Sequence, residues 1–117
     1  MNIIIYILLC HWFCDFVLQT RWQGNNKSKN LNALLSHTSI YSIAMAILLT
    51  PVLGLNALCF AGITFITHTI TDYFTSKINA YLWANKMEHT FWSSIGFDQF
   101  LHHLQLILTL NLFNQAI

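Results

Sequence analysis

In the stretch YILLCHWFCDFVL, residues 6–18, an imidazole and a carboxylate lie four residues apart inside an apolar run. Four residues make about one turn of an α-helix, so the two side chains share a helix face. The chain has four acidic residues, and three of them have a histidine at this spacing. We therefore interpret the pairs as one constellation of ligand-type side chains. The three pairs are His11/Asp15, His68/Asp72 and Asp98/His102.

The composition indicates a membrane protein. Of the 117 residues 56% are hydrophobic and 8% are charged, whereas charged residues make up about a quarter of a soluble domain. The length predicts one transmembrane domain, residues 1–117. The net charge is +1 and no basic patch is large enough to neutralise a run of phosphates, so we expect no nucleic-acid partner.

Polar stretches divide the chain into four apolar segments. Polar residues follow the first segment at 23–30, and Pro51 with Gly54 ends the second. The short link at Gly54 predicts an antiparallel hairpin of segments two and three. Each segment is long enough to cross a hydrocarbon core of about 30 Å. The predicted fold is all-α, an integral membrane four-helix bundle with helices at about 2–20, 31–50, 55–77 and 93–113.

The basic residues predict how the bundle is oriented. All of them lie in loop one or loop three of the predicted bundle, and Trp and Tyr residues flank the same loops. The positive-inside rule then places loops one and three in the cytoplasm and both termini outside. The mixed stretch 78–92 is interpreted as an interfacial lid that admits substrate. The basic residues are Arg21, Lys27, Lys29, Lys77 and Lys86.

Seven polar side chains of the four segments are predicted to lie at one depth. Counting about 1.5 Å per residue from the loop boundaries, all seven fall roughly 7 to 15 Å inside the cytoplasmic surface. A four-helix bundle would collect them in its core, as di-metal bundles collect their carboxylates and imidazoles. They are His11, Asp15, His37, His68, Asp72, Asp98 and His102.

Carboxylates at this depth need a positive partner. Each costs roughly 2.5 to 3.5 kcal/mol to insert near a helix centre, and the basic residues all lie at the boundaries. Protonated histidine, protonated aspartate or a metal ion would each compensate. A divalent metal fits best, with zinc favoured and manganese or iron as alternatives. Seven donors exceed the needs of one tetrahedral ion, which leaves two ions, or one ion with Asp groups orienting its His ligands.

Other polar residues are expected to have lesser roles. His89 lies in loop three and His103 is turned about 100° from its neighbour on the helix, so both are predicted to be peripheral. Gln19 and Gln99 are close enough in sequence to a core Asp to orient it. Glu88 is expected to be solvated, with service as a base from the lid as the alternative.

Several short motifs of the sequence resemble those of the small bacterial and phage membrane family known as domain of unknown function 3307. This resemblance implies a four-helix membrane protein and little about its activity. We expect the protein in the bacterial inner membrane, encoded by a bacterium or a phage. A looser likeness, to predicted membrane-bound metal-dependent hydrolases, implies hydrolysis. The motifs are His11-Trp12-x-x-Asp15-Phe16-x-Leu18-Gln19-Thr20, Asn26-Lys27-Ser28-Lys29, His37, His68-x-x-x-Asp72-Tyr73 and Gly96-x-Asp98-Gln99-x-x-His102.

Three functions are compatible with these residues. The first is a membrane-embedded metal-dependent hydrolase that acts on a lipid or another membrane-accessible substrate, with Asp15, Asp72 and Asp98 in catalysis. The second is a transporter of protons or metal ions that uses the same residues as a transient binding site. Because four helices are few for a transporter, the chain would then have to form a homo-oligomer. The third is a holin-like or regulatory membrane protein whose polar layer only fixes helix packing.

Overall fold

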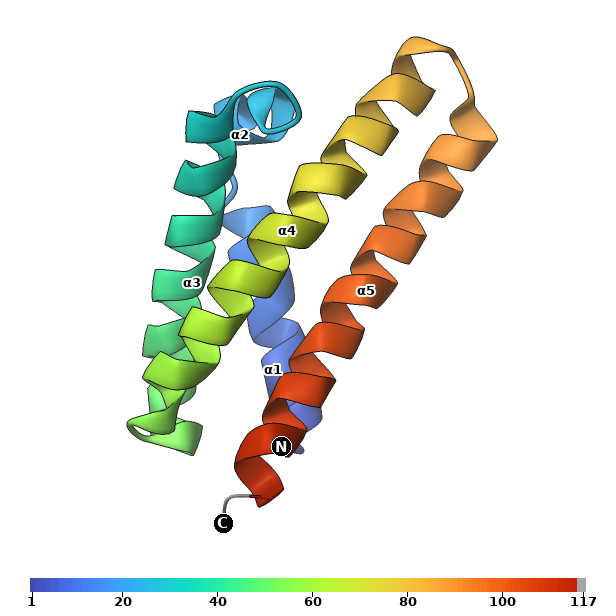
Figure 1. Ribbon diagram of the computed structural model, residues 1–117. Helices are drawn as coiled ribbons and strands as arrows, with labels where there is room; N and C mark the ends of the chain where they lie inside the picture. The colour runs from blue at the N-terminus through green and yellow to red at the C-terminus, as the bar shows by residue number, and fades with distance from the viewer. Residues whose placement is uncertain (116–117) are drawn as a thin grey trace.

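The computed structural model describes residues 1–115, and within that range the regular structure is helical, which confirms the predicted all-α class. Five α-helices are present, and a π-helical segment, η1, continues the first of them (Figure 1). The elements are α1 (Ile3–Trp12), η1 (Phe13–Val17), α2 (Arg21–Asn26), α3 (Leu31–Leu53), α4 (Asn56–Ala84) and α5 (Glu88–Gln115).

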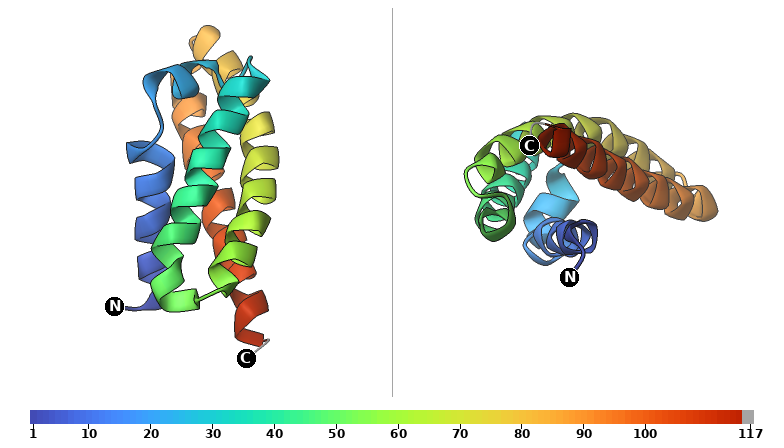
Figure 2. Two further views of the ribbon diagram at one scale, coloured as in Figure 1. Left: turned by 90° about the vertical axis from the view of Figure 1, so that its left-hand side faces the viewer. Right: turned by 90° about the horizontal axis from the view of Figure 1, so that it is seen from below.

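Four elements run alternately up and down, namely α1 with η1, α3, α4 and α5. Helix α3 packs on α4, α4 packs on α5, and α1 contacts both α3 and α5, so the helices enclose a common interior (Figure 2). The N-terminus, the last turn of α5 and the α3–α4 link lie at one end of the molecule (Figure 1). Helix α2 and the α4–α5 turn lie at the other end, and the predicted α3–α4 hairpin is present.

Several predicted helix ends are wrong. Helix α3 continues past Pro51 to Leu53, so the loss of one backbone hydrogen bond at the proline does not end it. It stops at Gly54, whose φ of 59° suits a residue without a side chain. The polar stretch 23–30 is also not all loop, since α2 forms there behind a capping box of Thr20 and Gln23.

The stretch 78–92 is mostly helical, so the predicted ends of helices three and four at 77 and 93 are wrong. Helix α4 continues to Ala84 and α5 begins at Glu88. The stretch contains neither proline nor glycine, so a helix extends into it from each side. A tight turn joins the two helices, and Lys86 adopts a φ of 58° there.

Within the described residues, one helix is long and apolar enough to cross a membrane, α3. The shorter segment Ile3–Val17 is apolar but has fewer residues than a span requires. Helices α4 and α5 have the length but not the apolar composition, because they carry many of the buried polar residues. The prediction of four spans is therefore not confirmed as a description of the fold.

The interior is divided between an apolar cluster at the end near the termini and a polar cluster above it. Phe60 belongs to the apolar cluster, is 0% exposed and lies 6.1 Å from the ring of Phe113. Replacing Phe60 with alanine is expected to lower the free energy of unfolding by roughly 3 to 5 kcal/mol, because it leaves a cavity. Thermal unfolding measures this loss. Leu58→Ala, at a site 65% exposed, serves as the control and is expected to change little.

Candidate metal centre

The structure brings all seven predicted side chains together in the bundle interior. Each is at most 8% exposed, although they come from α1, η1, α3, α4 and α5. The three pairs separated by four residues do project from common helix faces, as their spacing predicts. One carboxylate, Asp15, comes from η1, and π-helical turns of this kind are frequent at functional sites.

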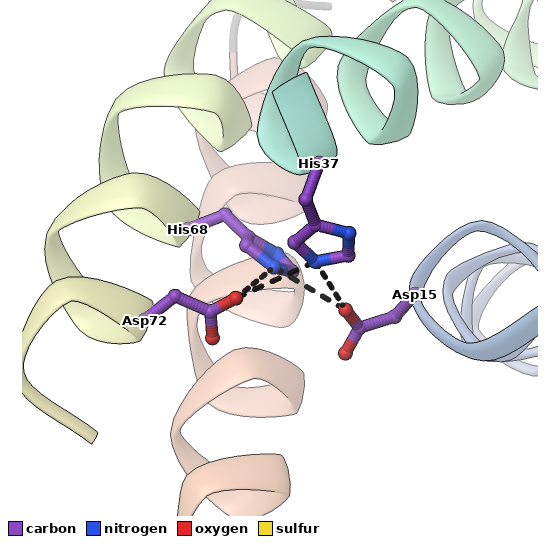
Figure 3. Close-up of side chains that lie close together, drawn as sticks. All are labelled: Asp15, His37, His68 and Asp72. Carbon is purple, nitrogen blue, oxygen red and sulfur yellow. Dashed lines mark hydrogen bonds and ion pairs between the residues drawn. The ribbon is translucent and has the colours of Figure 1, made fainter. Parts of the chain in front are cut away.

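Four of the side chains form a compact donor set, which we call set A (Figure 3). Nε2 of His37 lies 3.0 Å from Asp15 Oδ1 and 3.4 Å from Asp72 Oδ2. Nε2 of His68 lies 3.4 Å and 3.2 Å from the same two oxygens. Two imidazole nitrogens and two carboxylate oxygens from three helical elements therefore converge on one point.

The spacing of set A matches the coordination shell of a small divalent ion. Ligand atoms about 2.1 Å from a tetrahedral ion lie about 3.4 Å from one another. The four nitrogen-to-oxygen distances of set A range from 3.0 to 3.4 Å. These four distances therefore agree with a bound ion, and all donor atoms of the set lie within 4.8 Å of one another.

A second donor set, set B, adjoins set A and shares Asp72 with it. Nε2 of His102 lies 3.0 Å from Asp72 Oδ1 and 3.3 Å from Asp98 Oδ1. Asp72 therefore directs one oxygen into each set. Three donors leave one position of a tetrahedral ion open, which is the arrangement of catalytic rather than structural zinc sites.

His68 has no satisfactory partner without a cation. It is 1% exposed, and neither of its ring nitrogens has a hydrogen-bond partner within the described part of the chain. Its Nε2 lies close to Asp15 and Asp72, but the direction of approach is not that of a hydrogen bond. A buried imidazole of this kind costs free energy, and an ion in set A would bind its free nitrogen.

His11 lies beside the two sets rather than within either of them. Its Nδ1 is 2.7 Å from the hydroxyl of Tyr41 and its Nε2 is 2.9 Å from Oε1 of Gln99. The Gln99 amide in turn donates to Asp15 Oδ2 and to Asp98 Oδ2. A tautomer with hydrogen on Nε2 satisfies this chain, so His11 and Gln99 are placed to orient two carboxylates. Ligation of a metal by His11 stays a prediction.

Lys27 enters the cluster although its sequence position indicated only a boundary residue. It follows α2, is 19% exposed, and donates a hydrogen bond of 3.1 Å to Asp72 Oδ2. Burial alone would lower the pKa of its ammonium group, but the charges of Asp72 and Asp15 and the hydrogen bond to Asp72 raise the pKa above its ordinary value. The side chain is therefore positively charged.

A pocket of about 460 Å³ lies against the carboxylates, at the end of the bundle near α2 and the α4–α5 turn. Asp15, Asp72 and Asp98 form part of its lining, so all three face the space where a substrate could bind. Lys27 also lines it. Thr75 donates a hydrogen bond of 2.5 Å to Asp98 Oδ1 at this surface. The site therefore combines ligand-type side chains with access from outside.

The residues expected to be peripheral lie outside both donor sets. His89 and Glu88 are exposed, and both lie in the first turn of α5 rather than in a loop. His103 is partly buried, with its ring 5.2 Å from that of His11. Gln19 lines the pocket, and its Oε1 has no partner in the described residues. Sequence analysis missed Tyr41, although it is four residues from His37 and so shares its helix face.

Comparison with known proteins places the chain in one family. Residues 3–117 match the family model described as "Protein of unknown function (DUF3307)". The chain belongs to this family, which confirms the resemblance seen in its motifs. No curated protein and no solved structure matches the chain.

Proposed function

We propose that this member of the DUF3307 family is a membrane-embedded hydrolase that depends on two divalent ions. The observation that carries the proposal is the position of Asp72, whose two carboxylate oxygens face two different sets of His and Asp donors. Set A offers four donors and set B offers three. Zinc suits both sets, and manganese or iron are the alternatives.

A membrane location is supported by the distribution of polarity. Large hydrophobic side chains on every long helix are exposed, among them Ile5, Ile47, Ile66 and Leu108, while the charged cluster is buried. A patch of apolar surface this extensive needs a partner or a bilayer. The long axis measures 48 Å, close to the roughly 40 to 45 Å of a bilayer with its headgroups. We propose the bacterial inner membrane, with the α2 end in the cytoplasm because the basic residues lie there.

The chemistry of the site fits hydrolysis. Ions held in the two sets would polarise a substrate oxygen and lower the pKa of water at the open position of set B. Asp98 lines the pocket, and its Oδ2 accepts a hydrogen bond from Gln99, so this carboxylate is placed to take a proton from the water. Asp15 and Asp72 would hold the ions together with the imidazoles, and Asp98, the third donor of set B, would also accept this proton. Gln99 and His11 keep the carboxylates oriented.

Chelation tests the dependence on metal. Purified protein in detergent is expected to lose hydrolysis of lipid substrates when incubated with a chelator, and to recover it when zinc or manganese is added back. Loss should exceed about 100-fold, because several kcal/mol of transition-state stabilisation come from such ions. Retention of full activity after the chelator has removed all metal would contradict the proposal.

The alternative functions predict other outcomes in the same preparation. A transporter would move metal ions or protons across liposomes that contain the protein, without hydrolysing lipid. A purely structural polar core would bind no ion, and changing its three Asp to Asn together would leave the activity in cells unchanged. Metal-dependent hydrolysis that is lost in the triple variant would exclude both alternatives.

A further inference from the structure

Lys27 compensates negative charge in the site only while no ion is bound, because a bound ion would itself supply the positive charge. Its ammonium lies 3.1 Å from Asp72 Oδ2. The same oxygen lies within 3.4 Å of both imidazoles of set A. An ion in set A would take over this oxygen and repel the ammonium group. Because Lys27 lines the pocket and is already 19% exposed, its ammonium can turn into the pocket when the ion binds.

The formal charge of the site then indicates the charge of its substrate. Three carboxylates and the Lys27 ammonium give a charge of −2 when the imidazoles are neutral. Two divalent ions change this to +2, whereas a single ion would leave it at zero. A phosphate monoester carries about −1.5 to −2 at neutral pH and matches the loaded site. A carboxylic ester is uncharged and does not.

Three polar residues of the pocket lining carry a side-chain oxygen without a hydrogen-bond partner in the described residues. Gln19 Oε1, Ser76 Oγ and Asn79 Oδ1 line the pocket or belong to residues that do, and each is buried without a hydrogen-bond partner in the described residues. Buried polar atoms are usually paired. Rotation of these side chains would turn the amide N–H groups of Gln19 and Asn79 and the hydroxyl of Ser76 toward phosphoryl oxygens, which accept hydrogen bonds.

Aromatic residues also line the pocket. Trp83, Phe91 and Trp92 line it from α4 and α5, together with Phe16 from η1. Trp83 and Trp92 are more than half exposed, so the wall continues onto the outer surface of the bundle. A volume of about 460 Å³ suits a headgroup rather than a whole lipid, and the aromatic wall provides a path for an apolar tail to leave the pocket.

From these observations we infer that the substrate is a phosphate monoester carried on an apolar tail, with Lys27 binding its phosphoryl oxygens. This inference rests on the proposed function. The oxygen of water forms a bond to phosphorus, and the ester oxygen leaves with the electron pair of the broken bond. One proton of the water passes through Asp98 to the leaving oxygen. The products are the lipid alcohol and hydrogen phosphate.

The test compares Lys27→Met with wild-type protein in detergent micelles, both loaded with metal. Release of inorganic phosphate from phosphatidic acid is expected to fall roughly 10- to 100-fold, because a charged hydrogen bond to the phosphoryl group is lost. Inhibition by added inorganic phosphate should weaken to a similar extent. Affinity for metal should rise by at least about fivefold, because a neighbouring positive charge has been removed. Lys27→Arg is expected to restore much of the phosphate release.

Lys29→Met is the matched control, since Lys29 is exposed in the same loop, and it should behave as wild type. Unchanged phosphate inhibition in Lys27→Met would overturn the role of Lys27. Release of fatty acid from phosphatidylcholine, with no phosphate release from phosphatidic acid, would overturn the substrate class and leave metal-dependent hydrolysis standing. Hydrolysis of soluble phosphate esters as fast as of phosphatidic acid would overturn the apolar tail. Failure of wild-type protein to bind metal would instead defeat the proposed function itself.

Discussion

Replacing Asp72 with asparagine is expected to remove bound metal and abolish hydrolysis. The carboxylate gives one oxygen to each donor set, so the change leaves set A with three donors and set B with two. Loss of an outer partner of a metal ligand already costs about 10- to 100-fold in affinity, and loss of a shared ligand should cost more. Elemental analysis after gel filtration measures the effect, with two ions per chain expected in wild-type protein and none in the variant.

Two further variants make this result interpretable. Glu88→Gln makes the same change of acid to amide at an exposed position of α5, and it should keep both ions. Asp72→Asn also frees Lys27 from its partner, which could disturb folding. His68→Gln removes a donor but keeps the Lys27–Asp72 pair, and it should also lose the ion of set A. If both site variants retain as much metal as Glu88→Gln while helical content is unchanged, the donor sets are wrong.

Replacing Asp98 with asparagine is expected to separate the two ions. Asp98 belongs to set B alone, so the variant should keep the ion of set A and lose the other. Hydrolysis should fall by about 100-fold or more, because the open coordination position and the proton acceptor both depend on this carboxylate. Measurement of metal content and of kcat/KM on the same sample tests both parts.

The control for Asp98 is Thr75→Val, which removes the hydroxyl that donates to Asp98 Oδ1 and leaves the carboxylate in place. This variant should retain both ions. Its activity should fall by no more than about 10- to 100-fold, the usual effect of removing a hydrogen-bond partner of a metal ligand. An Asp98→Asn protein that binds two ions and keeps wild-type activity would show that set B has no catalytic role.

The convergence of the seven polar side chains could be predicted because two regular quantities govern it. The period of the helix puts His68 on the face of Asp72 and His102 on that of Asp98. The rise per residue puts all four segments' polar residues at one depth. Both quantities follow from sequence spacing alone and do not depend on any long-range contact.

The role of Lys27 could not be predicted in the same way. Its contact with Asp72 spans 45 residues and depends on how the chain turns after α2. In the sequence, Lys27 looked like the other basic residues of loop one. The end of α4 and the start of α5 were predicted wrongly for a local reason. The polar residues at 78–92 indicated a loop, although the stretch contains no proline or glycine.

Composition predicted four membrane spans, whereas within the described residues one helix, α3, is long and apolar enough to be one. The buried sides of α4 and α5 carry His, Asp and Thr residues of the site and lower the average hydropathy of those helices. Their outer faces remain apolar, with Ile66, Ile70 and Phe100 more than half exposed. Average hydropathy does not distinguish the two faces of a helix, whereas the three-dimensional structure does.

Anomalous X-ray scattering from crystals of the zinc-loaded protein tests the central claim most directly. The account predicts two peaks about 4 Å apart, one on each side of the Asp72 carboxylate. The first should lie among Asp15, His37 and His68, and the second between Asp98 and His102. Absence of any peak within coordination distance of Asp72, in crystals grown with saturating zinc, would contradict the account.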